Sequence, residues 1–208
     1  MLHQFYEQLF PKYFPESKIS ENIYSEIIAN YNIKTRFYHN TNHILMLLQE
    51  IENLKHELND VDVVLFAIWF HDVVYFPLKK NNEEKSAEFA EKKLQQSNLQ
   101  ISRRKQVSDL ILQTKFHIPK PLLKENFDLL TFLDADLMIL GSEPQKYEEY
   151  KNAVRKEYSM IPSLIYKKSR TEVLQKFLER TQIFQTPYFF EKYELKARRN
   201  IENEITAI

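Results

Sequence analysis

The sequence predicts an all-α fold, and three observations lead to this prediction. Apolar residues recur at the three- and four-residue spacing of an amphipathic helix along nearly the whole chain. No segment alternates apolar and polar residues convincingly over the length of a strand. Gly141 is the only glycine among 208 residues, whereas tight hairpin turns favour glycine. Because no internal repeat or linker-like stretch divides the chain, we expect a single helical domain over residues 1–208.

Two helices are expected in the segment that precedes Pro77. Thr41 or Asn42 could cap the first, which continues to about Leu54 with its apolar residues on one face. The second is expected from Asp60, which suits an N-cap, to Tyr75, because a proline disfavours helical backbone in the residue before it.

The rest of the chain has the same periodicity. Residues 83–96 place Ala87, Ala90 and Leu94 on one face, and Ser102 is the expected cap of the next helix. Gly141 is expected to close a helix over residues 128–140, since glycine favours the left-handed backbone found after a helix C-terminus. Further helices are expected at about 144–159, 163–181 and 188–205.

Composition excludes several classes of protein. Lys and Arg number 29, as do Asp and Glu, so the chain lacks the basic excess typical of proteins that bind nucleic acid or anionic membranes. With one glycine it has no glycine-rich phosphate loop, and a phosphate would be held by metal and side chains. The absence of cysteine excludes disulfides and thiolate ligands.

The pattern of hydrophobicity favours a cytoplasmic protein without a membrane partner. The N-terminus lacks the apolar core of a signal peptide. The most apolar run, residues 61–76, contains charged side chains and is shorter than the roughly 20 residues that a membrane span needs. No heptad pattern or long apolar seam predicts an oligomeric state.

Three segments place histidine and aspartate within apolar sequence. Residues 36–43 read Arg-Phe-Tyr-His-Asn-Thr-Asn-His, and the i, i+4 spacing of the two histidines puts both rings on one face of a helix or of its entry turn. Residues 69–75 contain the pair His71-Asp72 in a nearly continuous apolar run. Residues 132–137 contain two aspartates between apolar residues.

These polar residues indicate a shared metal site. A lone histidine on an apolar helix is more often a hydrogen-bonded core residue than a ligand. A carboxylate in such a helix, however, is costly to bury unless a cation or a full set of hydrogen bonds compensates it. Asp72 and Asp136 both pose this problem. One divalent ion held by imidazole and carboxylate groups would solve it for both residues.

The ordered series of motifs resembles the HD superfamily of metal-dependent phosphohydrolases. It is similar in particular to the small predicted metal-dependent HD phosphohydrolases of bacteria, and the similarity spreads over nearly the whole chain. The Tyr-His-Asn-x-x-His segment is also distantly similar to the cyclic-nucleotide phosphodiesterases. The matching segments are Arg36 to His43, Trp69 to Tyr75, Asn82 to Ala87, Asp134 to Gly141, Arg155 to Tyr158, and Ala197 to Asn200.

The resemblance implies a single HD-type helical bundle and a set of metal ligands. These ligands are His43, His71, Asp72 and Asp136. Of the two aspartates in the third segment, Asp136 rather than Asp134 matches the ligand that precedes leucine in the family.

The likeness to the phosphodiesterases implies a role for the first histidine of the Tyr-His-Asn motif. His39 matches the residue that helps to protonate the leaving group. Those enzymes carry a further histidine at the position of Tyr75, which is one of the residues that allow them to hold two metals. We therefore expect one firmly held metal, and a second only together with substrate.

Three other residues are additional candidates. Arg36 is expected to clamp a phosphoryl oxygen because of its place in the motif. Glu83 could position a water molecule or bind a second metal, although glutamate is also common in the first turn of a helix because of the helix dipole. His117 could approach the site, since several HD subfamilies add histidines in this part of the chain, or it could simply be a solvent-exposed residue.

The expected reaction is metal-dependent hydrolysis of a phosphoester in a small phosphorylated substrate, such as a nucleotide or similar metabolite. The metal would be Mn, Mg, Fe, Co, Ni or Zn, because the ligand types do not distinguish them. Two alternatives remain open. One is an HD-fold di-iron oxygenase, which would need both His117 and Glu83 as further ligands. The other is a non-catalytic module that binds metal or nucleotide for regulation.

Overall fold

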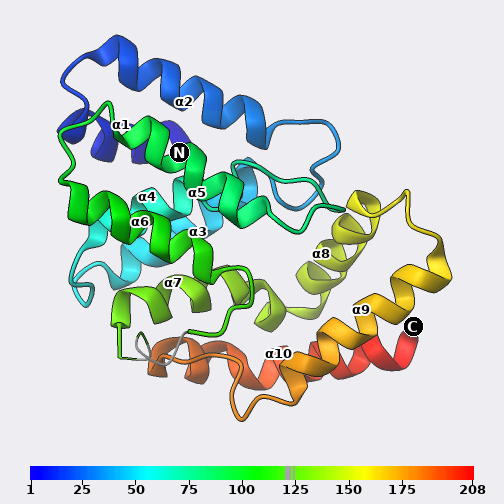
Figure 1. Cartoon of the computed structure of the whole chain (residues 1–208). Helices are drawn as coiled ribbons and strands as arrows, with labels where there is room; N and C mark the ends of the chain where they lie inside the picture. The colour runs from blue at the N-terminus through cyan, green and yellow to red at the C-terminus, as the bar shows by residue number, and fades with distance from the viewer. Residues whose placement is uncertain (120–122, 124) are drawn as a thin grey trace. The chain divides into compact units, whose positions relative to one another are not determined.

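The structure is a computed structural model that describes residues 1–119, 123 and 125–208 (Figure 1). All regular elements of the described residues are helices, which confirms the all-α fold class. Contacts between Cα atoms group the chain into two compact units, Met1–Phe132 and Leu133–Ile208, with the boundary inside helix α7 (Phe127–Leu137). None of the described helices has the length and hydropathy required to cross a lipid bilayer.

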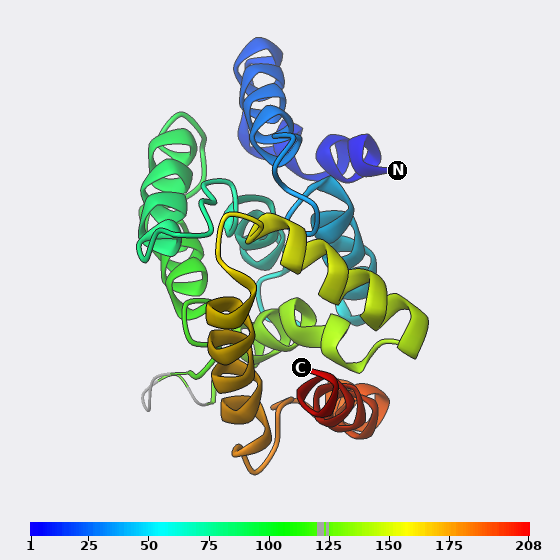
Figure 2. The same cartoon turned by 90° about the vertical axis from the view of Figure 1, so that its right-hand side faces the viewer.

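The first unit is built around helix α4 (Val61–Phe70), most of whose side chains are buried. This helix contacts α3, α5 and α6, and α5 and α6 lie side by side in both views (Figures 1 and 2). Such a helix is apolar on all sides because it has neighbours on all sides. The other helices of this unit are α1 (Leu2–Tyr13), α2 (Ser17–Tyr31), α3 (Thr41–Leu54), α5 (Asn82–Leu94) and α6 (Ile101–Gln113).

Aromatic side chains form the core between α4 and the N-terminal helices. Phe10 on α1 meets Phe66 and Trp69 edge-on, with ring centroids 5.4 and 5.6 Å apart, and all three side chains are fully buried. These edge-to-face contacts add to the free energy gained by removing large apolar surfaces from water. The core therefore fixes α4 firmly, including the end of the helix that leads into His71.

Helix α4 is shorter than the sequence predicts. Asp60 is its N-cap as expected, and its carboxylate accepts a hydrogen bond from Val63 N at 3.1 Å. The prediction that the helix continues to Tyr75 is wrong, because the helix ends at Phe70 and a turn follows. Side chains from other segments satisfy backbone groups of this turn, so the chain loses few hydrogen bonds by leaving the helix here.

Other boundaries differ by one to three residues. Helix α3 is capped by Asn40, whose side-chain oxygen accepts a hydrogen bond from Asn42 N at 2.9 Å, rather than by Thr41 or Asn42. Helix α6 begins at Ile101, one residue before the expected cap Ser102.

The second unit holds the end of α7 and four further elements. In this unit the short 3-10 helix η2 contacts α8 and α10, and α9 contacts α10. The elements are η2 (Met138–Gly141), α8 (Pro144–Glu157), α9 (Ser163–Leu178) and α10 (Pro187–Ala207).

Gly141 is required by close packing rather than by a left-handed backbone. Its φ is not positive, so the expected left-handed C-cap is wrong. A Cβ atom at this position would lie 2.6 Å from both Cβ and the carbonyl oxygen of Tyr193 on α10. Asn200 secures the same approach, since its Nδ2 donates to the carbonyl oxygens of Leu140 and Ser142, each at 2.9 Å.

Candidate metal centre

His71 stands directly at the end of the buried helix α4. Its side chain is 1% exposed, and its Nδ1 lies 2.9 Å from the carbonyl oxygen of Ile68. Because a carbonyl oxygen can only accept, Nδ1 carries the hydrogen and Nε2 of the neutral ring presents a lone pair. Metal-binding histidines are commonly fixed in this way by a hydrogen bond from the other ring nitrogen.

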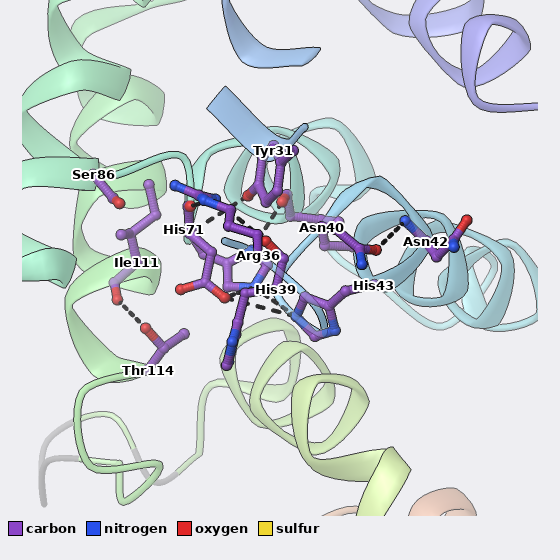
Figure 3. Close-up of polar contacts among 12 residues, drawn as sticks. Tyr31, Arg36, His39, Asn40, Asn42, His43, His71, Ser86, Ile111 and Thr114 are labelled. Atoms are coloured by element: carbon purple, nitrogen blue, oxygen red, sulfur yellow. Dashed lines mark hydrogen bonds and ion pairs between the residues drawn. The ribbon is translucent and has the colours of Figure 1, made fainter. Parts of the chain in front are cut away.

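His43 and Asp72 bring two more donor atoms to the same place. His43 lies in the first turn of α3, is 1% exposed, and its Nε2 is 3.1 Å from Nε2 of His71. Oδ2 of Asp72 is 3.2 Å from Nε2 of His71 and 3.8 Å from Nε2 of His43. Figure 3 shows the two imidazoles from α3 and from the end of α4 turned toward one another. Among the described residues these three form a group able to hold a metal ion.

The donor set and its spacing fit one divalent cation. Two ligand atoms that each lie about 2.1 Å from one ion, at an angle of about 90° to 110°, are separated by roughly 3.0 to 3.4 Å. Two of the three separations, 3.1 and 3.2 Å, fall in this range, and the third, at 3.8 Å, is somewhat wider. Two imidazoles and one carboxylate are ligands that manganese, iron, cobalt, nickel and zinc all accept.

A hydrogen bond between the two imidazoles is the simplest structural explanation of the pair. A proton on Nε2 of His43 would satisfy the lone pair of His71, because the Nε2–Nε2 distance is 3.1 Å. Oδ2 of Asp72 would then still face the lone pair of His71 at 3.2 Å. A hydrogen on Nε2 of His71 would instead face both Nε2 of His43 and Oδ2 of Asp72, so the three atoms can share either a proton or one divalent cation.

The predicted fourth ligand, Asp136, lies on the last turn of α7 in the second unit and is not part of the three-residue group. Its neighbour Asp134 has a clear structural task. The buried carboxylate of Asp134 accepts hydrogen bonds from Gln185 N at 2.9 Å and from Thr186 N and Oγ1 at 2.7 and 2.8 Å. Burial raises the pKa of Asp134 to about 6, although these donors oppose the shift.

His39 lies beside the group, on the loop between α2 and α3. Its ring is half-buried, lies 5.9 Å from the ring of His43, and stacks on Tyr75 with 4.2 Å between centroids. Tyr75 is the position at which the resemblance to the phosphodiesterases predicted a histidine. In this chain that position supports His39 by aromatic packing.

Arg36 does not have the geometry expected of a phosphate clamp. Its side chain is buried, and Nη1 and Nη2 donate to the carbonyl oxygens of Asp72 and Val73 at 2.6 and 3.0 Å. The guanidinium therefore binds the turn that carries Asp72. Sequence alone could not distinguish the two roles, because the motif gives the position of the arginine but not the direction of its side chain.

Helix α5 supports the same turn through two residues to which the sequence assigned no role. Oγ of the fully buried Ser86 lies 3.1 Å from N and 3.2 Å from O of Val74. Asn82 bonds both backbone groups of Phe76, with Nδ2 3.0 Å from its O and Oδ1 3.1 Å from its N. The two side chains are four residues apart in the Asn-Glu-x-x-Ser-Ala motif, a spacing that indicates one helix face.

Glu83 lies between these two supports in the first turn of α5. Burial raises the pKa of its carboxyl group, and the charge of Asp72 raises it further while that of Lys115 lowers it. The carboxylate is thus within electrostatic range of Asp72.

His117 follows α6 and lies outside the three-residue group. Its φ is 47°, in the left-handed region of backbone conformation that is unfavourable for a histidine.

The structure thus brings His43, His71 and Asp72 together, with His39 and Glu83 close by. Comparison with protein family models, with curated proteins and with solved structures finds no match to this chain.

Proposed function

We propose that the chain is a metal-dependent phosphohydrolase whose metal is held by His43, His71 and Asp72. One observation carries the proposal: two buried imidazole nitrogens and a carboxylate oxygen from two separate segments converge within 3.8 Å of one another. Nothing in ordinary packing requires three such atoms to meet in a mostly apolar interior. Asp136 remains the fourth ligand that the sequence motif predicts.

The nearby side chains suit the other tasks of phosphoester hydrolysis. A bound divalent ion lowers the pKa of a water molecule and neutralises phosphoryl oxygens. We assign the donation of a proton to the leaving oxygen to His39, because its ring is half-buried beside His43 and is held by its stack on Tyr75. We assign the orientation of the attacking water to Glu83, because its carboxylate is partly desolvated and senses the charge of Asp72.

The substrate is proposed to be a small phosphorylated metabolite, such as a nucleotide. The resemblance described above supports this class, and the neutral net charge argues against a polymer of nucleic acid. Lys115 near Glu83 is a source of positive charge for a phosphate, although its Nζ also binds Glu84 and donates to the carbonyl oxygen of Lys80 at 2.8 Å.

The test combines elemental analysis with a phosphatase screen. Wild type, His43→Ala and Asp72→Asn are purified, loaded with divalent ions and analysed for bound metal, and His56→Ala provides the control because His56 is an exposed histidine in the same unit. The proteins are then tested on nucleotides and sugar phosphates. We expect near-stoichiometric metal and phosphate release for wild type and the control, and loss of both in the two site variants.

Other outcomes would change the proposal in defined ways. Metal without hydrolysis would favour a regulatory binding module, and a coloured, iron-loaded protein would favour the di-iron oxygenase. If wild type held no metal even after loading, the three residues would be structural and the proposed function would be wrong.

A further inference from the structure

The guanidinium of Arg36 contacts both segments that contribute to the candidate centre. Nη1 and Nη2 bind the carbonyl oxygens of Asp72 and Val73, in the turn after α4. Nη1 also lies 3.4 Å from the carbonyl oxygen of His39, a long hydrogen bond within the loop before α3. Since Arg36 itself belongs to that loop, its side chain joins the loop to the turn (Figure 3).

Two aromatic rings near the same guanidinium extend this connection. The guanidinium carbon of Arg36 lies 5.2 Å from the ring centroid of Tyr31 and 5.5 Å from that of Tyr75. Tyr75 stacks on His39 in turn, and the hydroxyl of Tyr31 accepts a hydrogen bond from Asp72 N at 3.2 Å. Each ring that packs on Arg36 therefore also contacts a residue of the proposed centre.

We propose that Arg36 is the positioning residue that sets the ligand Asp72 and the proton donor His39 relative to each other. The inference rests on the proposed function for the roles of these two residues, but the connection itself is a property of the fold. An arginine suits this task because its planar fork offers several donors in fixed directions, whereas lysine offers one nitrogen. Residues that orient ligands in this way commonly change metal affinity about 10- to 100-fold when they are lost.

The first test is hydrogen–deuterium exchange of metal-free wild type and Arg36→Ala. We expect faster exchange in residues 37–42 and in residues 72–76 together, and little change in α1. Arg103→Ala is the matched control. Arg103 also packs on a tyrosine, with its guanidinium carbon 5.3 Å from the ring centroid of Tyr13, and forms two 2.7 Å contacts with Asp60. It acts at the opposite end of α4, roughly 15 Å away along the helix.

The second test is a Mn²⁺ titration followed by electron paramagnetic resonance. We expect Arg36→Ala to bind Mn²⁺ about 10-fold or more weakly than wild type, and added guanidinium ion to restore part of the affinity. Arg103→Ala should bind Mn²⁺ like wild type and should not respond to guanidinium. A general loss of stability would not be repaired by one small cation in one variant only.

Two further substitutions make the test independent of whether Arg36→Ala folds. Arg36→Lys keeps the charge but not the fork, and should also weaken Mn²⁺ binding. Tyr75→Leu removes the ring between Arg36 and His39 and should raise exchange in residues 37–42, whereas Tyr75→Phe keeps the ring and should not.

The outcomes separate this inference from the proposed function. Wild-type Mn²⁺ affinity in both Arg36 variants, or faster exchange in only one of the two segments, would overturn the positioning role and leave the phosphohydrolase proposal intact. A wild type that binds neither Mn²⁺ nor any of the other divalent ions would remove the proposed function. The exchange experiment would then still decide whether Arg36 joins the loop to the turn.

Discussion

The hydroxyl of Ser86 satisfies both backbone groups of Val74, with Oγ 3.1 Å from N and 3.2 Å from O. One side-chain atom on α5 therefore holds the residue two positions after Asp72 in place. The serine side of the contact is fully buried, so water has little access to it.

We expect Ser86→Ala to lower the free energy of unfolding by about 1 to 3 kcal/mol, because it leaves two backbone groups unsatisfied. It should also weaken metal binding, because the turn with Asp72 loses a support. Ser97→Ala is the control, since Oγ of Ser97 likewise contacts two backbone groups, Leu94 O at 2.6 Å and Leu99 N at 3.2 Å, but at the far end of α5. Chemical denaturation and a metal titration distinguish the two. Equal metal affinity in both variants would show that Ser86 supports stability alone.

Thermal unfolding gives a separate measure of the metal site. A ligand that binds only the folded chain stabilises it by about 2.7 kcal/mol at a free concentration of about 100 times its dissociation constant. We expect Mn²⁺ to raise the melting temperature of wild type and of His56→Ala, and a chelator to reverse the effect. His43→Ala should show no such rise. A rise of the same size in His43→Ala would place the ion elsewhere.

The raised pKa of Asp134 predicts a pH dependence of stability. Its pKa is about 6 in the fold, against 3.8 for an ordinary aspartate, so the folded chain binds a proton more tightly than the unfolded chain. The free energy of unfolding should therefore fall as pH rises from about 4 to about 6, by on the order of 3 kcal/mol from this group.

Denaturation of wild type and of Asp134→Asn at several pH values between 4 and 7 measures this contribution. The variant cannot titrate at this position, so the difference in slope between the two proteins isolates Asp134 from the other carboxyl groups. Parallel curves would mean that the hydrogen bonds from Gln185 and Thr186 outweigh burial and keep the pKa of Asp134 near its ordinary value.

Gly141→Ala tests whether close packing explains the only glycine. At a position without positive φ, alanine normally stabilises a protein by about 0.4 to 1 kcal/mol, because the unfolded chain has less freedom. Here the new Cβ atom would lie 2.6 Å from Tyr193, so we expect destabilisation of about 1 to 3 kcal/mol instead. The sign of the change, measured by chemical denaturation, decides between the two explanations.

The helices of the chain could be predicted where they depend on local pattern. The apolar faces of α3, α5 and α8 to α10 gave their positions to within a few residues. Helices α1 and α2 were not among the expected elements. The spacing that would have predicted α2 is present nonetheless, since Ile23, Ile27 and Tyr31 lie four residues apart and are all buried. For these helices, the spacing of apolar residues within the segment itself is enough to predict the helix.

The turn after α4 shows what local pattern cannot give. The apolar run continues through Val73 and Val74, so the sequence favours more helix than the structure contains. The helix ends because Arg36 and Ser86, from segments distant in sequence, satisfy the backbone groups of the turn. Likewise the sequence marked His43, His71 and Asp72 as unusual, but the direction of the Arg36 side chain depends on tertiary contacts that the motif does not record.

The two imidazoles that face each other are 28 residues apart in the sequence. An ion held by both would close the chain into a loop that contains the whole connection between α3 and α4. In the chain-entropy model, a permanent closure of this length stabilises a fold by about 3 to 4 kcal/mol, because it reduces the freedom of the unfolded state. A protein without cysteine would thereby acquire a reversible cross-link, which opens when the ion is withdrawn and not when the surroundings become reducing.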